Sequence, residues 1–490
     1  MTNTKAGTNS EAETLKSKAA KGFMWGGLNN GLVQVISALF GIILLRWLCP
    51  EDYGKIAMLM VFADIASTLQ ESGFTAALCN LKEPLHRDYN AVFWFNILVS
   101  ALLYVVLFLS APLIARFYDD LDFIPLARYL FLGFFVSSWG TVQRAYLFIH
   151  LMQKESCIIA ITSVIGSNSI GVLMVYMGYS YWGLATQKIA FILIVALMNW
   201  YYSPWRPTFD IDLRPAWKMF SFSWKLLLTN IVNSLSSNAF SFLLGKYYGK
   251  HLTGVYSNAR KWDDMCSNTI NGMLTGVAQP VLTQVREDTD RYRMVFRKML
   301  RFISFISFPC LLGMGLIARE FIVIVVGSKW IESAALLSML CIYGAIWPLL
   351  TLYSQMTISQ GRSNINMWCT ICLSTLILTG LVLLYPLGIY AMVAYFVSIN
   401  VLWLFVWQYF AWRLIRLRLW DALRDVLPFF FISVAVMGGT WWLTQPIQNT
   451  WLLLISKIIT AIVLYSGIMW ISGARIMQES IQFLRGKANI

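Results

Sequence analysis

The sequence predicts an all-α polytopic membrane protein with about fourteen transmembrane helices, built as two parallel six-helix lobes followed by two further helices. Three observations predict this class. Hydrophobic residues make up 58% of the 490 positions, and the mean hydropathy is +0.62, a balance that a water-soluble domain could carry only by exposing large apolar patches. Apolar runs that could cross about 30 Å of hydrocarbon recur along almost the whole chain. Polar residues also recur in the same order about 200 positions apart.

The N-terminal segment is polar, and the apolar stretch that begins near Gly22 is too long for the core of a signal peptide. It also lacks a clear small-residue cleavage site. We therefore expect a retained cytoplasmic tail. The predicted order is a tail at 1–21, a first lobe at 22–202, a cytoplasmic linker at 203–217, a second lobe at 218–410, a basic cytoplasmic loop at 411–425, helices 13 and 14 within 426–472, and a cytoplasmic tail at 473–490.

Basic residues are distributed unevenly between the predicted loops. The net charge is +14, and 25 of the 38 lysines and arginines fall in segments predicted to be cytoplasmic, against seven in outer loops. Such a bias sets membrane orientation and favours anionic lipid, so it does not indicate nucleic-acid binding. It predicts a membrane protein with both termini in the cytoplasm.

The chain contains an internal repeat. "LIAR" occurs at residues 113–116 and again at 316–319, but one short string could arise by chance. A longer series of matches at an offset of 200 lies in order, and it slips to 203 before the second "LIAR". The pairs include Asn30 with Asn230, Ser37 with Ser237, Gly54 with Gly254, Asp64 with Asp264, Ser67 with Ser267, Glu71 with Asn271 and Thr75 with Thr275. This series indicates a duplicated unit of about six helices, and two parallel six-helix halves are typical of a transporter.

Polar residues follow helical spacing within the repeated helices. Asp64, Ser67 and Glu71 share one face of the second predicted helix, and Asp264 with Ser267 repeats the pattern in the second copy. A charge at bilayer depth costs about 3 kcal/mol or more, so we expect these faces to line a water-filled cavity or to pair within the bundle.

Structural explanations stay open for several of these charges. Arg260 lies three and four residues before Asp263 and Asp264, a spacing that could form an internal ion pair instead of a transport site. Arg128 and Arg144, near opposite ends of one predicted helix, could extend to the lipid headgroups. Lys188 lies about two turns inside its span, which favours a place in a cavity.

Other kinds of chemistry find little support in the sequence. The eight cysteines are scattered, and the one CxxC, Cys369–Cys372, has no second pair of ligands. The three histidines share no spacing, and no phosphate-binding GxxxxGK[ST] motif occurs. We expect no bound cofactor, with Na⁺ or H⁺ coupling as the candidate source of energy.

Two long stretches carry a family resemblance: LLRWLCPEDYGKIAMLMVFADIASTLQESGFTAAL and AVFWFNILVSALLYVVLFLSAPLIARFYDD. Together with RAYLFIHLMQKES and GVYSNARKWDDM they resemble the polysaccharide exporters of the multidrug/oligosaccharidyl-lipid/polysaccharide (MOP) superfamily. The likeness covers the first twelve predicted helices and is closest to the colanic-acid or lipopolysaccharide exporter branch.

The resemblance implies a V-shaped pair of lobes that flips undecaprenyl-diphosphate-linked oligosaccharide to the periplasmic leaflet by alternating access, for lipopolysaccharide or exopolysaccharide biosynthesis. Arg260 with Lys261 matches the basic site on the family's eighth helix, and Asp64 matches an acidic position on its second. Asn271 replaces the second copy's glutamate, which argues against a symmetric ion-coupling scheme. The candidate substrate-binding residues are Arg260, Lys261, Lys188, Arg128, Arg144, Asn30 and Asn230, and the candidate ion-coupling residues are Asp64, Glu71, Asp263 and Asp264.

The expected partners are a lipid-linked oligosaccharide, membrane lipids and the polysaccharide polymerase with its chain-length machinery, and the expected state is a monomer. One alternative is a cation-coupled multidrug exporter of the same superfamily, which would favour acidic and aromatic cavity walls. A second is a polytopic glycosyl-transfer enzyme, but no predicted loop exceeds roughly twenty residues, which is too short for the usual catalytic loop with paired carboxylates. A third is a scaffold without transport, in which removal of the charges of Arg260 and Asp64 would change only stability.

Overall fold

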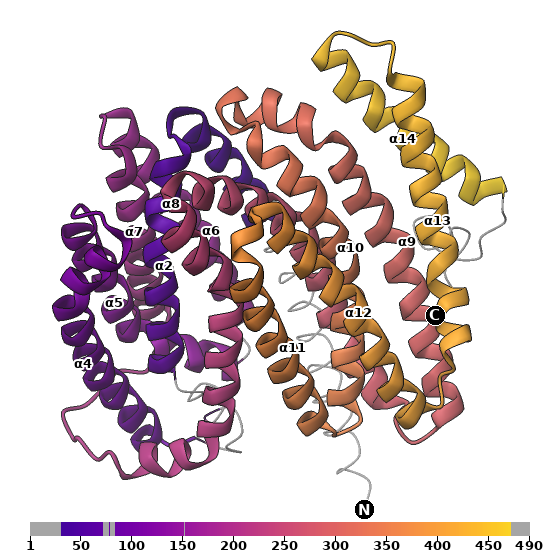
Figure 1. The fold of residues 1–490 in the computed structure, drawn as a ribbon. Helices are drawn as coiled ribbons and strands as arrows, with labels where there is room; N and C mark the ends of the chain where they lie inside the picture. The colour runs from indigo at the N-terminus through magenta and orange to yellow at the C-terminus, as the bar shows by residue number, and fades with distance from the viewer. Residues whose placement is uncertain (1–30, 72–77, 79–83, 151, 472–490) are drawn as a thin grey trace, which may run out of the picture. The chain divides into compact units, whose positions relative to one another are not determined.

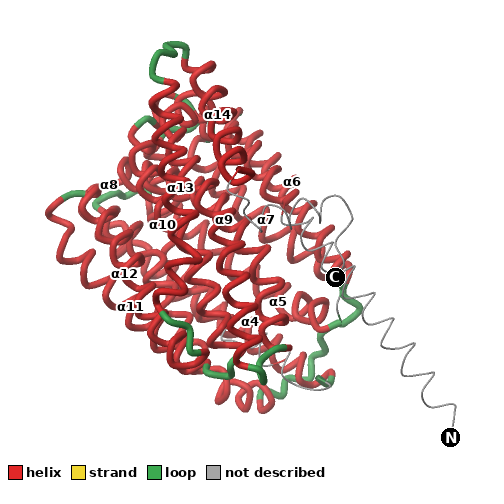
Figure 2. Tube along the Cα trace, turned by 90° about the vertical axis from the view of Figure 1, so that its right-hand side faces the viewer, coloured by secondary structure: helices red, strands yellow, loops and turns green. Residues whose placement is uncertain are grey.

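The computed structural model describes residues 31–71, 78, 84–150 and 152–471, and nearly all of this range is helical (Figure 1). No strand occurs among these residues, and short loops connect the helices (Figure 2). The helices are Gly31–Trp47, α2 (Pro50–Glu71), α4 (His86–Tyr118), α5 (Phe123–Ile149), α6 (Gln153–Tyr176), α7 (Ser180–Tyr202), α8 (Arg214–Gln284), α9 (Thr289–Phe321), η1 (Ile322–Val326), η2 (Ser328–Trp330), α10 (Glu332–Ser359), α11 (Ser363–Leu384), η3 (Tyr385–Leu387), α12 (Ile389–Ile415), α13 (Leu419–Thr444) and α14 (Thr450–Ile471).

α8 is two helical segments joined at Gly249. The backbone of Gly249 has φ 76° and ψ −177°, a conformation that is open to glycine and strained for other residues. When segments 214–248 and 250–284 are counted separately, the described part of the chain holds fourteen α-helices, so the predicted class and helix number are confirmed. Ten of these helices are long and apolar enough to cross a membrane, whereas α2 and α8 fall short of that hydropathy. The polar faces predicted on these two helices explain the difference.

Helix boundaries follow the repeat found in the sequence. α4 and α9 begin 203 residues apart, at His86 and Thr289, and they end 203 residues apart, at Tyr118 and Phe321. Both therefore have the same length, and the second "LIAR" lies at the same place in α9 as the first in α4. This agreement supports a duplicated unit.

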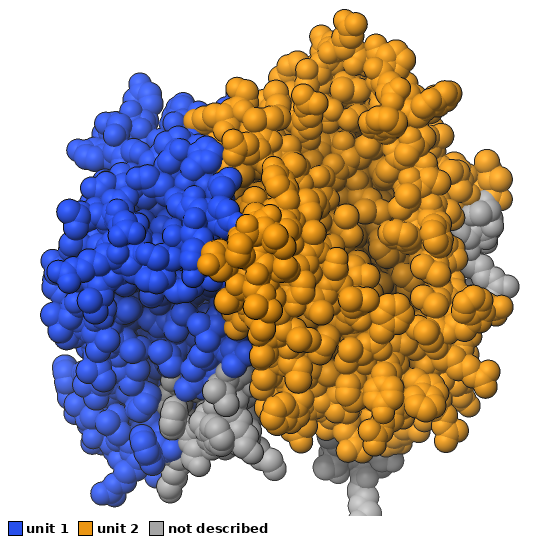
Figure 3. Space-filling view, viewed as in Figure 1, with its two compact units in different colours: residues 1–254 blue, residues 255–490 orange. Residues whose placement is uncertain are grey.

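The chain divides into two compact units, residues 1–254 and 255–490 (Figure 3). The lobe boundaries at 22–202 and 218–410 stay predictions. The stretch expected to be a basic loop, 411–425, contains the end of α12 and the beginning of α13.

Unit 1 is built around α5, which packs against both α4 and α7, while α6 packs on α7. Leu126 and Phe131 of α5 are fully buried beside Leu59 of α2. On the outside of α4, four large apolar side chains follow helical spacing and are 53–68% exposed: Leu102, Val105, Leu109 and Leu113. Such an apolar face is suited to lipid.

Two glycines allow α2 to cross the beginning of the second α8 segment at very short distance. A Cβ atom on Gly54 would lie 1.8 Å from the carbonyl oxygen of Lys250, and one on Gly254 would lie 1.8 Å from that of Pro50. Gly54 and Gly254 are counterparts in the repeat, as are Pro50 and Lys250. No side chain fits at either glycine unless a backbone moves, which explains why both copies have glycine here.

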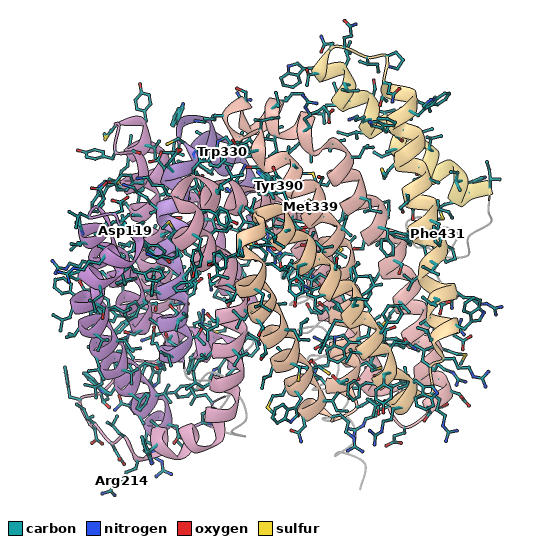
Figure 4. All side chains as sticks on the ribbon, viewed as in Figure 1. Asp119, Arg214, Trp330, Met339, Tyr390 and Phe431 are labelled. Carbon is teal, nitrogen blue, oxygen red and sulfur yellow. The ribbon has the colours of Figure 1, made fainter. Side chains whose placement is uncertain are left out.

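In unit 2, α9 packs against α10 and α13, and α14 packs against α9 and α13. Charged groups join the last two helices to α9. Lys457 Nζ of α14 lies 2.8 Å from Glu320 Oε1 of α9, and each side chain is only 8% exposed. Arg297 of α9 binds Asp425 of α13 through Nε at 2.5 Å and Nη2 at 3.2 Å. The lipid side of α13 carries large apolar side chains such as Phe431, which is 61% exposed (Figure 4).

Candidate functional site

Arg260 lies in the second segment of α8 and faces aromatic rings from two other helices of unit 2. Its Cζ lies 5.1 Å from the ring centroid of Tyr343 in α10 and 5.9 Å from that of Phe396 in α12. Its Nε lies 3.0 Å from Asp264 Oδ1, so the internal ion pair that the i,i+4 spacing left open is present. The side chain is 25% exposed, but its Nη1 is buried and has no hydrogen-bond partner. The guanidinium thus has donor capacity beyond the bond to Asp264.

Asp263 is the buried member of the same cluster. Its side chain is fully buried, and neither carboxylate oxygen has a hydrogen-bond partner. The nearest cation is Arg260, whose Nη1 lies 3.8 Å from Asp263 Oδ2. Gly344 of α10 leaves room for this carboxylate, because a Cβ atom there would lie 2.1 Å from Oδ1. Asp264, by contrast, is 35% exposed.

The neighbouring predicted residues lie on the same α8 segment. Lys261 Nζ lies 5.8 Å from the ring centroid of Trp262, which is the next residue along the helix. Asn271, the replacement for the repeated glutamate, is buried, and its amide nitrogen and oxygen have no hydrogen-bond partner.

A second polar group forms in unit 1 from three helices. Asp64 of α2 is half-buried, is hydrogen-bonded by the side chain of Asn238 in the first α8 segment, and is close enough to Lys188 of α7 for their charges to attract. Lys188 itself is exposed. Lys188 thus lies near Asp64, but farther away than an ion-pair contact. Sequence reasoning overlooked Asn238, although its neighbour Ser237 had been matched to Ser37 in the repeat.

The remaining candidates lie apart from this group. Arg128 is half-buried on α5, with Cζ 4.2 Å from the ring centroid of Phe108 in α4, so its charge is placed over an aromatic ring. Arg144 is exposed on α5, and Asn230 is exposed on α8. Asn30 and the side chain of Glu71 lie outside the described residues.

Several buried polar side chains were not predicted. Gln70 of α2 accepts a hydrogen bond from Ser137 of α5 at 3.1 Å through Oε1. Asn96 of α4 and Gln143 of α5 are fully buried, and their amide atoms have no hydrogen-bond partner. Single amides in otherwise apolar sequence have no periodic pattern, which is why they were missed.

The turn between α4 and α5 is acidic and binds lysines from two helices of unit 1; Figure 4 labels its first residue, Asp119. Asp120 Oδ2 lies 3.1 Å from Lys250 Nζ and 3.6 Å from Lys55 Nζ. Burial alone would raise the pKa of Asp120, but the hydrogen bond from Lys250 and the nearby lysine charges lower it below its ordinary value. The turn therefore ties α2 to α8.

Metal chemistry has no support in the part of the chain that the structure describes. No three His, Cys, Asp or Glu side chains are grouped there so that they could hold a metal ion. In the CxxC, Cys369 is buried while Cys372 is exposed, and both are free thiols.

The chain is similar to known proteins of polysaccharide biosynthesis. The family model described as "Polysaccharide biosynthesis protein" matches residues 43–335. The teichuronic acid biosynthesis protein TuaB of Bacillus subtilis (strain 168) is 26% identical over 387 residues, which cover 77% of this chain and 78% of the relative. The lipopolysaccharide biosynthesis protein WzxC of Escherichia coli (strain K12) is 24% identical over 369 residues, or 72% of each chain.

Solved structures share the fold. The lipid II flippase MurJ in an inward closed conformation matches with a TM-score of 0.74 at 12% identity, over 90% of this chain and 97% of the other. An inward-facing multidrug resistance MATE family transporter of the MOP superfamily matches with a TM-score of 0.58 at 12% identity, over 84% and 98% of the two chains. At these identities the likeness shows the fold alone.

Proposed function

The chain belongs to the polysaccharide biosynthesis protein family, as the resemblance predicted, and on this premise we propose that it is a flippase for lipid-linked oligosaccharide. The protein is a multi-pass bacterial membrane protein. The proposed substrate is an oligosaccharide on undecaprenyl diphosphate, which moves from the cytoplasmic to the periplasmic leaflet by alternating access between two six-helix lobes. The proposed role is in surface polysaccharide biosynthesis, with transport and no covalent chemistry.

The observation that carries the proposal is a guanidinium within a helix bundle of the membrane. A diphosphate that crosses about 30 Å of hydrocarbon needs positive charge and hydrogen-bond donors along its path, whereas its lipid tail needs neither. Arg260 supplies the charge and remains one-quarter exposed, while its Nη1 is buried 3.8 Å from Asp263 without a hydrogen-bond partner. Arginine binds phosphate through two donors at once, which suits a diphosphate.

Other residues have supporting roles in this proposal. The further substrate-binding candidates are Lys261, Lys188, Arg128, Arg144, Asn30 and Asn230, and the ion-coupling candidates are Asp64, Glu71, Asp263 and Asp264. Coupling to Na⁺ or H⁺ is proposed as the energy source. We place the protein in the inner membrane as a monomer with both termini in the cytoplasm, working beside a polymerase and its chain-length machinery.

A cell experiment tests the proposal. In a bacterial strain that lacks its own exporter but makes the lipid-linked oligosaccharide, expression of this chain should make the glycan accessible from outside. Accessibility is measured by digesting the glycan on intact spheroplasts with an impermeant glycosidase. Cys372→Ser, which changes an exposed thiol, is the control variant and should behave as the wild type. Glycan that stays protected, together with export of a cationic dye, would instead support the multidrug reading.

A further inference from the structure

We propose that the carboxyl group of Asp263 is a proton-binding site, and that its protonation releases Arg260 to bind the anionic headgroup of the substrate. This inference rests on the proposed function, because it assigns the ligand of Arg260 as a diphosphate. It goes further by naming the coupling ion, the residue that carries it and the sense of the coupling.

The charge balance around Arg260 is the first argument. One guanidinium faces two carboxylates, with Asp264 at 3.0 Å and Asp263 at 3.8 Å. If both carboxylates are ionised, the cluster holds one excess negative charge in a buried place, which is costly. A proton on Asp263 removes that excess and leaves Arg260 with Asp264 as a one-to-one pair.

The surroundings of Asp263 favour the proton over a metal cation. Both carboxylate oxygens are buried without a hydrogen-bond partner, and the group is packed closely against Gly344. A hard cation such as Na⁺ prefers several oxygen ligands around it. A proton needs no additional ligand.

The titratable and charged groups near Asp263 come from two helices. On α8 they are Tyr256, Arg260, Asp264 and Cys266, and on α10 they are Cys341 and Tyr343. Among these groups, Arg260 is the cation and Asp264 is the other carboxylate. Tyrosine and cysteine side chains are ordinarily neutral near pH 7, so the balance depends on the two carboxylates.

The sense of the coupling follows from competition for Arg260. An ionised Asp263 attracts the guanidinium, whereas a protonated Asp263 does not. Headgroup binding and protonation therefore favour each other, and each must strengthen the other by the same factor. Binding should tighten as the pH falls, by at most about tenfold per pH unit for one linked proton, and should level off once Asp263 is protonated.

Binding of a soluble probe tests this inference. The probe is farnesyl-diphospho-glucose, a diphosphate diester that does not titrate in this range, added to the full-length protein in nanodiscs between pH 5.5 and 8.5. We expect the wild-type dissociation constant to rise with pH. Asp263→Asn, which mimics the protonated form, should bind with the low-pH affinity at every pH. Asp290→Asn is the matched control, because Asp290 is 81% exposed at the beginning of α9 and pairs with Arg293, and it should keep the wild-type dependence.

Calorimetry measures proton uptake directly, first on the wild-type protein. Titrations in buffers of different ionisation enthalpy should show proton uptake when the probe binds, and Asp263→Asn should abolish it. The inference would be overturned by a dissociation constant that does not vary with pH and by binding without proton uptake. The proposed function would then still stand if Arg260→Ala loses binding. Dependence on Na⁺ at constant pH would also overturn the inference, in favour of a sodium site. A wild-type protein that fails to bind at any pH would overturn the proposed function itself.

Discussion

Replacing Arg260 with alanine is expected to weaken binding of a lipid diphosphate by roughly 30- to 5,000-fold. Loss of one partner from a buried, hydrogen-bonded charge pair costs about 2–5 kcal/mol, and this range converts to that factor. The guanidinium is held beside Tyr343 and Phe396, so a neighbouring lysine such as Lys261 cannot take its place without moving. The measurement is the dissociation constant of the same diphosphate probe at pH 6.

Stability must be separated from binding in this variant, because alanine leaves Asp263 and Asp264 without their cation. The double variant Arg260→Ala/Asp264→Asn removes one of these charges and should unfold at a temperature nearer to that of the wild type. Arg260→Lys keeps the charge but loses the planar pair of donors, so it should bind with intermediate affinity. Wild-type affinity in a folded Arg260→Ala protein would show that Arg260 only fixes helix packing.

Replacing Lys457 with methionine is expected to lower the free energy of unfolding by about 3–5 kcal/mol, the usual cost of breaking a buried ion pair. The substitution leaves Glu320 buried at 8% exposure without its cation, with Oε2 already lacking a hydrogen-bond partner. α14 should then detach from α9 more readily. The measurement is denaturant unfolding in detergent, followed by tryptophan fluorescence.

The double variant Lys457→Met/Glu320→Met separates charge from packing. Because both charges are gone, most of the lost stability should return, since replacing a buried pair with apolar side chains is often neutral. The substitution Asp290→Asn, which removes the 81% exposed partner of Arg293, should change the free energy of unfolding little by comparison, because solvent screens that ion pair. Equal losses in the single and double variants would contradict the assignment of the buried pair.

The sequence allowed the helices to be predicted well where hydrophobicity alone decides the structure. The last two helices were expected within 426–472, and α14, which runs from Thr450 to Ile471, lies inside that range. Helix 13 was expected from about Val426, but α13 begins at Leu419. Its first two turns carry Asp421 and Asp425, and such charged residues are typical of a loop in the sequence. In the fold they are helical, and both bind Arg297 of α9.

The candidate site could be predicted in part. Helical spacing placed Arg260 beside Asp263 and Asp264, because contacts between neighbouring turns of one helix are local. The aromatic residues Tyr343 and Phe396 could not be foreseen, since they reach Arg260 from helices that lie far away in the sequence. The difference in burial between Asp263 and Asp264 is equally invisible in sequence, because it depends on packing against α10.

The central claim is that this chain carries a lipid diphosphate headgroup across the membrane, and a vesicle assay tests it most directly. Purified protein is reconstituted with a fluorescent prenyl-diphosphate-linked sugar, and dithionite, which quenches only the outer leaflet, is added outside. Vesicles with the wild-type protein should lose nearly all fluorescence, whereas protein-free vesicles and those with Arg260→Ala should lose only the outer half. Loss of only the outer half in wild-type vesicles, as in empty ones, would contradict the account.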